Sequence, residues 1–261
     1  MSQLLAIDTS TAACSVAIST DGKVVEDFVI APQDHTQRLL PMVDNLLASK
    51  NLQLSDIDAI AFTNGPGSFT GLRICLSIVQ GLAFGANLPV IPISTLEVMV
   101  AGAQRLLNLG VKQNILPMLD ARMAEVYWGL YKPADQSDQA PICLVADSVS
   151  SFSEVMKSKA GEYLRSQPCL GLGDGWNTLN SDISGQGNED TASAGLLKEN
   201  RLNECADLVV HGDFYPHAYD LAVLGQLLFD QGKAIPVDQA KLNYLRNEIS
   251  WQKRQKIRKD Q

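Results

Sequence analysis

The sequence is poor in the residue types from which metal sites and disulfide frameworks are built. It contains five cysteines and three histidines in 261 residues. The cysteines are scattered, odd in number and never spaced as a C-x-x-C pair, which is typical of a reduced cytoplasmic protein and disfavours a catalytic cysteine. His211 and His217 are six residues apart, so they lack the i, i+4 spacing that puts two ligands on one helix face. The sequence therefore predicts no metal site.

Long apolar runs and a basic N-terminus are also missing. No apolar run approaches the roughly 20 residues that span a bilayer. The start Met1–Leu4 lacks the basic region of a signal peptide. We therefore expect a cytoplasmic protein with no membrane partner.

Basic residues are too few to make a nucleic-acid-binding body. The chain has 21 Lys and Arg against 29 Asp and Glu, a net charge of −8. The segment Trp251–Gln261 carries a local +4, which leaves −12 on the rest of the chain. An acidic body argues against direct nucleic-acid binding by the main fold, because phosphate contacts need a basic face. The basic segment is interpreted as a solvated terminus, with contact to RNA or an acidic partner as the alternative.

What is present is a substantial core and an α/β order. Hydrophobic residues make up 46% of the chain and charged residues 19%, as in globular proteins large enough for one or two domains. Periodicity predicts three antiparallel strands, followed by helix, strand, helix and strand, which fits a mixed sheet with helices on its faces. The expected strands are Gln3–Asp8, Cys14–Ser19, Lys23–Ile30, Ala59–Thr63 and Leu88–Ile93. Helices are expected around Leu39–Leu47, capped by Asp34 or Thr36, and over Leu72–Phe84, Thr95–Leu107, Phe152–Lys159 and Ala218–Phe229.

The segment Asn64–Arg73 is a glycine-rich turn between a buried strand and a helix. Ser68 or Thr70 can cap the helix with a hydroxyl group. Such a strand–loop–helix junction can cradle an anion at the helix N-terminus, and it can equally be a tight turn only. The helix that follows is apolar almost all round, so a partner or a second layer must cover one of its faces. Gly81 and Gly85 would permit close backbone approach there.

Several motifs together carry a family resemblance. They are Leu5–Thr11, His35–Pro41, Gly65–Arg73 and Leu119–Tyr127, with a weaker one at Tyr244–Glu248. In order and spacing they resemble the TsaB (YeaZ) family. One departure is Leu242, where the family commonly has a proline, so the local turn stays open.

The resemblance implies an actin/Hsp70/sugar-kinase-like (ASKHA) α/β fold with two similar subdomains, each a mixed sheet flanked by helices. The first subdomain would comprise residues 1–108 and about 218–235. The second, degenerate one would comprise 109–217, and residues 236–261 would form a C-terminal tail.

The resemblance also implies a function in tRNA modification. A TsaB-type chain is a non-catalytic subunit that dimerises with a TsaD-type catalytic subunit, in a complex with a TsaE-type ATPase. The complex forms N6-threonylcarbamoyladenosine beside the anticodon, so tRNA would be an indirect partner, and the chain alone would form a homodimer. No cofactor would be tightly bound, because ATP, ADP and Mg²⁺ are used mainly at the partner subunits. The metal-binding H-x-x-x-H pair of TsaD is absent from this sequence. The implied partner interface comprises His35, Arg38, Leu39, Leu40, Met42, Val43, Leu46, Arg73, Ile74, Ser77, Ile78 and Gly81.

A second site is a degenerate phosphate or nucleotide site. In nucleotide-binding relatives the turn after the first strand wraps phosphate, and its aspartate holds a metal through water. Those relatives usually have glycine in this turn, whereas bulkier residues stand here and narrow the cradle. The site would comprise Asp8, Thr9, Ser10, Thr11, Gly65, Gly67 and Ser68. An open site would favour the alternative function, an ATP-binding kinase-like or peptidase-like enzyme of the same fold.

Three further clusters favour structural roles. Asp120, Arg122 and Glu125 are interpreted as an ion-pair cluster rather than an acid–base pair. Gly171–Gly175 is interpreted as a plain turn rather than an adenosine-side turn. His35 and Arg38, one turn apart at a helix start, fit a surface contact or a cap. The Ser-, Gly- and Asn-rich stretch 180–193 is expected to be an exposed loop.

Overall fold

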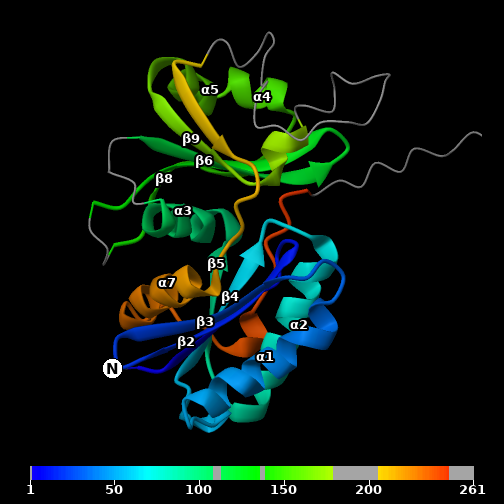
Figure 1. Cartoon of the computed structure of the whole chain (residues 1–261), viewed down its shortest axis with the longest axis vertical. Helices are drawn as coiled ribbons and strands as arrows, with labels where there is room; N and C mark the ends of the chain where they lie inside the picture. Colours follow the sequence, from blue (N-terminus) through cyan, green and yellow to red (C-terminus); the bar gives the residue numbers. More distant parts are fainter. Residues whose placement is uncertain (1, 108–112, 136–138, 179–204, 247–261) are drawn as a thin grey trace, which may run out of the picture.

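The computed structural model describes residues 2–107, 113–135, 139–178 and 205–246, so the predicted loop at 180–193 and the basic segment lie outside it. Two five-stranded mixed sheets make up the described chain, one above the other in Figure 1. The first has the order β3-β2-β1-β4-β5. Its strands are β1 (Leu4–Asp8), β2 (Ala13–Thr20), β3 (Lys23–Ile30), β4 (Ala59–Gly65) and β5 (Val90–Ser94).

The second sheet repeats the topology of the first. Its strands are β6 (Asn114–Arg122), β7 (Glu125–Lys132), β8 (Ile142–Ser150), β9 (Pro168–Leu172) and β10 (Asp207–His211). In each sheet the first strand is central, antiparallel to the second strand and parallel to the fourth. The third strand then pairs antiparallel with the second, and the fifth parallel with the fourth. This duplicated arrangement confirms the predicted ASKHA fold.

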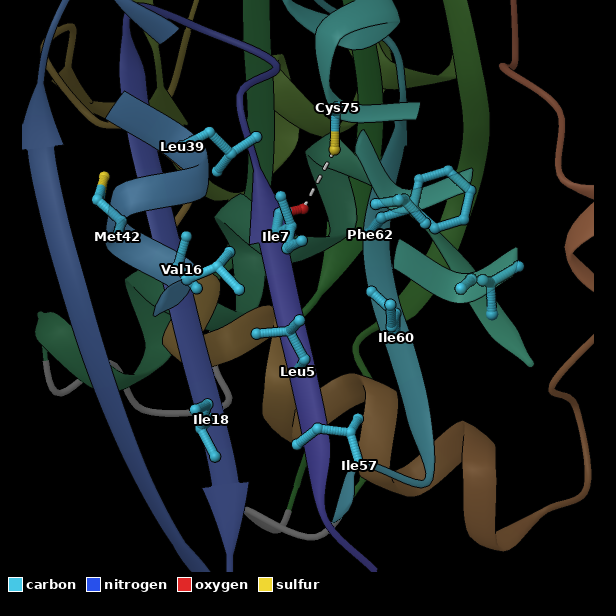
Figure 2. Close-up of a cluster of buried hydrophobic side chains, with 14 of the residues drawn as sticks. Leu5, Ile7, Val16, Ile18, Leu39, Met42, Ile57, Ile60, Phe62 and Cys75 are labelled. Atoms are coloured by element: carbon cyan, nitrogen blue, oxygen red, sulfur yellow. Dashed lines mark hydrogen bonds between the residues drawn. The ribbon is translucent and has the colours of Figure 1, made fainter. Parts of the chain in front are cut away.

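Helices cover both faces of the first sheet. On one face lie α1 (His35–Ser49) and α2 (Phe69–Ala86), and on the other α3 (Thr95–Leu106) and α7 (Ala218–Asp230). The alternation of β1 explains the two layers: Leu5 and Ile7 point into the α1/α2 core, and Leu4 and Ala6 into the α7 core. Figure 2 shows the first of these cores, in which Cys75 of α2 donates its thiol to the Ile7 carbonyl at 3.4 Å.

The second sheet shares α3 with the first unit. Leu96, Met99 and Val100 of α3 pack on the second sheet, whereas Val98 joins the core beneath α7. The opposite face carries α4 (Phe152–Lys157) and α5 (Lys159–Ser166). The sequence predicted one helix over Phe152–Lys159. The chain instead leaves helical geometry at Ser158 (φ −82°, ψ 177°), whose hydroxyl accepts from Ala160 and starts a second helix.

After α7 the chain returns to the first unit. Val90 and Ile235 exchange backbone hydrogen bonds of 2.8 and 2.9 Å, and Ala240 is buried in the α1/α2 core. Residues 235–243 are therefore fixed to the first unit, the last of them through the Asn243 N–H to the Asn64 carbonyl, although the sequence suggested that a tail begins at 236. The subdomain boundaries themselves stay a prediction, which the packing of α7 against the first sheet supports.

Helix α2 is strongly apolar, but many of its residues are exposed. Its 18 residues have a mean hydropathy of 1.4, so by length and composition it could cross a membrane, and the expectation that no apolar run comes near that length was wrong. It is a packing helix instead, because Leu72, Cys75, Val79 and Ala83 lie in or against the sheet core. Five of its 18 residues are buried and five more are half-buried against the same core, so its open face consists of the eight exposed residues, with the large side chains of Phe69 and Phe84 near its ends.

Candidate functional site

The predicted nucleotide site centres on Asp8, at the carboxyl end of β1. This side chain is fully buried, and its Oδ1 accepts from the Ser10 hydroxyl at 2.6 Å and the Thr63 hydroxyl at 2.5 Å. Its Oδ2 is buried without a hydrogen-bond partner among the described residues. Burial raises the pKa of Asp8, more than its hydrogen bonds to Ser10 and Thr63 lower it. Burial at this site therefore disfavours the charged form of Asp8 relative to an exposed carboxyl group.

The turn after Asp8 is filled by the loop before α2. The Ser68 N–H donates to the Ser10 carbonyl at 2.7 Å, and the Thr9 hydroxyl donates to the Gly71 carbonyl at 2.8 Å. A Cβ at Gly67 would lie 2.3 Å from the Ser10 oxygen, and one at Gly71 would lie 2.0 Å from the Thr9 oxygen. The glycines thus bring the chain's own two loops together.

The remaining predicted residues of this site also form contacts within the chain that close the turn after Asp8. Ser68 accepts from the Gly71 N–H at 3.2 Å, so the predicted cap is confirmed. The Thr11 hydroxyl accepts from the Ala13 N–H within its own turn. At Gly65 (φ 117°) a Cβ would lie 2.9 Å from the Asn243 oxygen. The structure thus brings the predicted site residues together, but as contacts with one another rather than as an open anion cradle.

The matching turn of the second sheet holds ion pairs. Arg122 contacts Asp120 at 2.8 Å, as the sequence predicted. Glu125 pairs with Arg246 instead, a contact that the sequence interpretation missed because the partners are far apart along the chain. At the glycine cluster, a Cβ on Gly171 would lie 2.6 Å from the Trp176 ring, which supports a packing role.

Helix α1 turns most of its predicted interface residues inward. His35 is buried, with Nε2 3.1 Å from the Ala13 carbonyl, so the expectation of a surface contact there is corrected. Asp34 precedes α1 without a side-chain cap bond and lies 3.7 Å from Arg38, so the predicted cap is also corrected. Four further predicted interface residues lie on the apolar face of α1 and are buried against the sheet, so they are not accessible to a partner: Leu39, Met42, Val43 and Leu46.

The exposed residues of the predicted interface form a stripe on α2. Arg73, Ser77 and Gly81 are exposed, whereas Ile74 and Ile78 are half-buried beside them. No atom lies within 4 Å of the Cβ that an alanine at Gly81 or Gly85 would carry. Phe69 and Phe84, which are 57% and 82% exposed, stand near the two ends of the helix and were not predicted as interface residues. On α1, Arg38 and Leu40 are exposed.

A cavity of about 320 Å³ lies beside the start of α3. Asp147 of β8 accepts from the Ser94 hydroxyl at 2.5 Å and from the Tyr131 hydroxyl. Burial, followed by the charge of Asp147, raises the pKa of Glu97 to about 7. The sequence carried no motif for this group, because its members lie on β5, α3, β7 and β8, far apart along the chain. Among the described residues there is no cluster of three or more side chains suited to hold a metal ion.

The doubled sheet topology and the closed turn at Asp8 define the class: an ASKHA-fold protein whose nucleotide loop is occupied by its own backbone. Residues 29–234 match the family model described as TsaD, tRNA N6-adenosine threonylcarbamoyltransferase. The chain is 37% identical to the tRNA threonylcarbamoyladenosine biosynthesis protein TsaB of Escherichia coli K12, over 96% of this chain and 97% of that one. The same protein of Haemophilus influenzae is also 37% identical, over 96% of each chain. The solved structure of YeaZ from Pseudomonas aeruginosa superposes with a TM-score of 0.75 at 33% identity, covering 94% of this chain and all of that one. The chain belongs to the TsaB (YeaZ) family.

Proposed function

We propose that the chain is a non-catalytic activating subunit in the biosynthesis of N6-threonylcarbamoyladenosine in tRNA. It would dimerise with a TsaD-type catalytic subunit, in a cytoplasmic complex that includes a TsaE-type ATPase and acts next to the anticodon. Two relatives that match nearly the whole chain are named for this biosynthesis. The closed turn at Asp8 supports a role outside the chemical step.

The observation that carries the proposal is the open face of α2. Eight of the 18 residues of α2 are exposed, and Phe69 and Phe84 among them leave large apolar side chains in water, as sites of protein association do. The open space at Gly81 and Gly85 lets the backbone of a partner helix approach closely. Phe69 and Phe84 supply aromatic anchors near the two ends. The interface is thus proposed for the exposed residues of α2, with Arg38 and Leu40 of α1 beside them.

The same face would also support a homodimer of the isolated chain. An apolar face that lacks its partner can be covered by a second copy through a twofold axis. ATP, ADP and Mg²⁺ would act mainly at the partner subunits, and tRNA would be held through the complex.

The experiment is light scattering on a sizing column, with the chain alone and then mixed with the TsaD-type subunit. The proposal expects a homodimer that is replaced by a one-to-one complex. A mixture that elutes as two separate species under all nucleotide conditions would contradict it.

The alternative, a kinase-like or peptidase-like enzyme acting alone, requires an open site at Asp8. Calorimetric titration of the isolated chain with ATP and Mg²⁺ distinguishes the two functions. The subunit proposal expects binding no tighter than millimolar, because the Ser68 N–H is already bonded to Ser10. Micromolar binding that depends on Asp8 would favour the enzyme.

A further inference from the structure

The C-terminal segment Ala240–Arg246 runs over the loop before α2 and reaches the second sheet. The Asn243 N–H donates to the Asn64 carbonyl at 2.8 Å, at the end of β4. Three residues further on, Arg246 pairs with Glu125 at the start of β7. The segment is thus fixed at two points, and Tyr244 lies between them.

Tyr244 holds the side chain of Arg73 on α2. The Arg73 Nε donates to the Tyr244 hydroxyl at 3.1 Å, and the Arg73 guanidinium carbon lies 3.6 Å from the centre of the Phe69 ring. The Phe69 and Tyr244 ring centres are 6.1 Å apart. All three side chains remain exposed, with Tyr244 at 44%. The guanidinium is therefore preorganised at the surface, at the N-terminal end of the open α2 face.

The charges around this cluster indicate what it meets. Arg246 is neutralised by Glu125, and Arg122 by Asp120. Among the described residues Arg73 has no carboxylate within ion-pair distance. Of the described cations in this cluster and the C-terminal segment, only Arg73 and Lys241 lack an ion pair, which is few for a phosphate backbone that needs several. One ordered arginine between two exposed aromatic rings is instead the composition of a protein hot spot.

We propose that Tyr244 is a positioning residue for partner binding: it fixes Arg73 so that the guanidinium pairs with a carboxylate on a helix of the TsaD-type subunit packed along α2. This rests on the proposed function and deepens it. It extends the interface from the two helices to the C-terminal segment. Arg73 supplies the charge, and Tyr244 reduces the entropy lost when that side chain is immobilised on binding.

The test is a double-mutant cycle on the full chain with the TsaD-type subunit, measured as dissociation constants and as association rates over a range of salt concentrations. Arg73→Ala should weaken binding roughly tenfold or more and flatten the salt dependence of the association rate, because a steering charge is lost. Tyr244→Phe keeps the ring and removes the hydroxyl, and should weaken binding about three- to fivefold. In the Arg73→Ala background Tyr244→Phe should have no further effect, because the hydroxyl would act only through Arg73.

The matched control is Lys157→Ala on α4, an exposed position away from α2 that loses the same charge. It should change neither the dissociation constant nor the salt dependence. Equal melting temperatures of all variants would establish that folding is intact. Additive effects of Arg73→Ala and Tyr244→Phe on the dissociation constant would overturn the inference. So would an Arg73→Ala variant that binds the partner as tightly as the Lys157→Ala control. So would variants that bind the partner normally but lose affinity for tRNA, since the cluster would then be an RNA contact. A wild-type chain that does not bind the partner would overturn the proposed function itself.

Discussion

The backbone N–H of Ser68 donates to the carbonyl oxygen of Ser10 at 2.7 Å, and this bond joins the loop before α2 to the turn after β1. In a phosphate-binding turn such an N–H points at the ligand. Here it is used within the chain, together with the 2.8 Å bond from the Thr9 hydroxyl to the Gly71 carbonyl. The loop that resembles a nucleotide site therefore acts as a clamp that fixes the first turn of α2 on the sheet.

The clamp makes opposite predictions for two glycines of α2. Gly71→Ala places a Cβ 2.0 Å from the Thr9 backbone oxygen, so we expect it to lower the free energy of unfolding by about 2 to 4 kcal/mol. Gly81→Ala meets open space, and should raise it by roughly 0.5 to 1 kcal/mol because alanine favours the helix. Chemical denaturation of both variants measures the difference. A Gly71→Ala protein as stable as Gly81→Ala would show that the two loops are not tightly packed.

Asp8 should tolerate the loss of its charge but not of its hydrogen bonds. Asp8→Asn keeps an oxygen for the Ser10 and Thr63 hydroxyls, and we expect it to be at least as stable as the wild type at pH 7. The direction of the pH effect on stability follows from the raised pKa of Asp8 in the folded protein. The buried acid stabilises the fold below its unfolded pKa, and that contribution is lost as the pH rises towards the folded pKa. Asp8→Ala leaves both hydroxyls unpaired and should cost about 2 to 4 kcal/mol.

The measurement for Asp8 is denaturation of both variants, together with tRNA modification by the reconstituted complex. Asp8→Asn should modify tRNA at the wild-type rate. If Asp8→Asn were stable but abolished modification, Asp8 would act as a charged ligand, and the account of the closed turn would fail.

Glu97 should make stability fall with rising pH. Its pKa is raised to about 7 by burial and by Asp147, so its contribution is complete below its ordinary value of 4.5 and lost between 4.5 and about 7. Relative to Glu97→Gln, the wild type should lose on the order of 2 to 3 kcal/mol across that window. Unfolding free energies measured at a series of pH values test this. Glu162→Gln, at an exposed position on α5, is the control for loss of a carboxylate, and its profile should run parallel to that of the wild type. A parallel profile for Glu97→Gln would contradict the prediction.

Local patterns predicted the α/β order of the first unit, whereas the duplicated ASKHA fold was predicted from the family resemblance. The apolar run of β1, the alternation of β2, the glycine turn before α2 and the Ser68 cap are each encoded within a few residues. The candidate site was only partly predictable. Leu39 and Met42 have the spacing of one apolar helix face, but periodicity alone could not say whether that face meets the sheet, as it does, or a partner. The pairs Glu125–Arg246 and Ser94–Asp147 join residues more than 50 positions apart, so no local pattern could reveal them.

The most direct test of the account is the affinity of the TsaD-type subunit for a chain with Ser77→Glu and Gly81→Glu. Both positions are exposed on the open face of α2, so the double variant should fold. Charges at Ile74 and Ile78 would be a poorer test, because these half-buried side chains also pack within the chain. The control is Ser166→Glu, at an exposed position on α5. We predict that the double variant stays folded, loses its homodimer and binds the partner at least about 100-fold more weakly, because two buried charges would lack partners. The control should bind like the wild type. A folded double variant that pairs with wild-type affinity would show that the interface is not on α2 and would contradict the central claim.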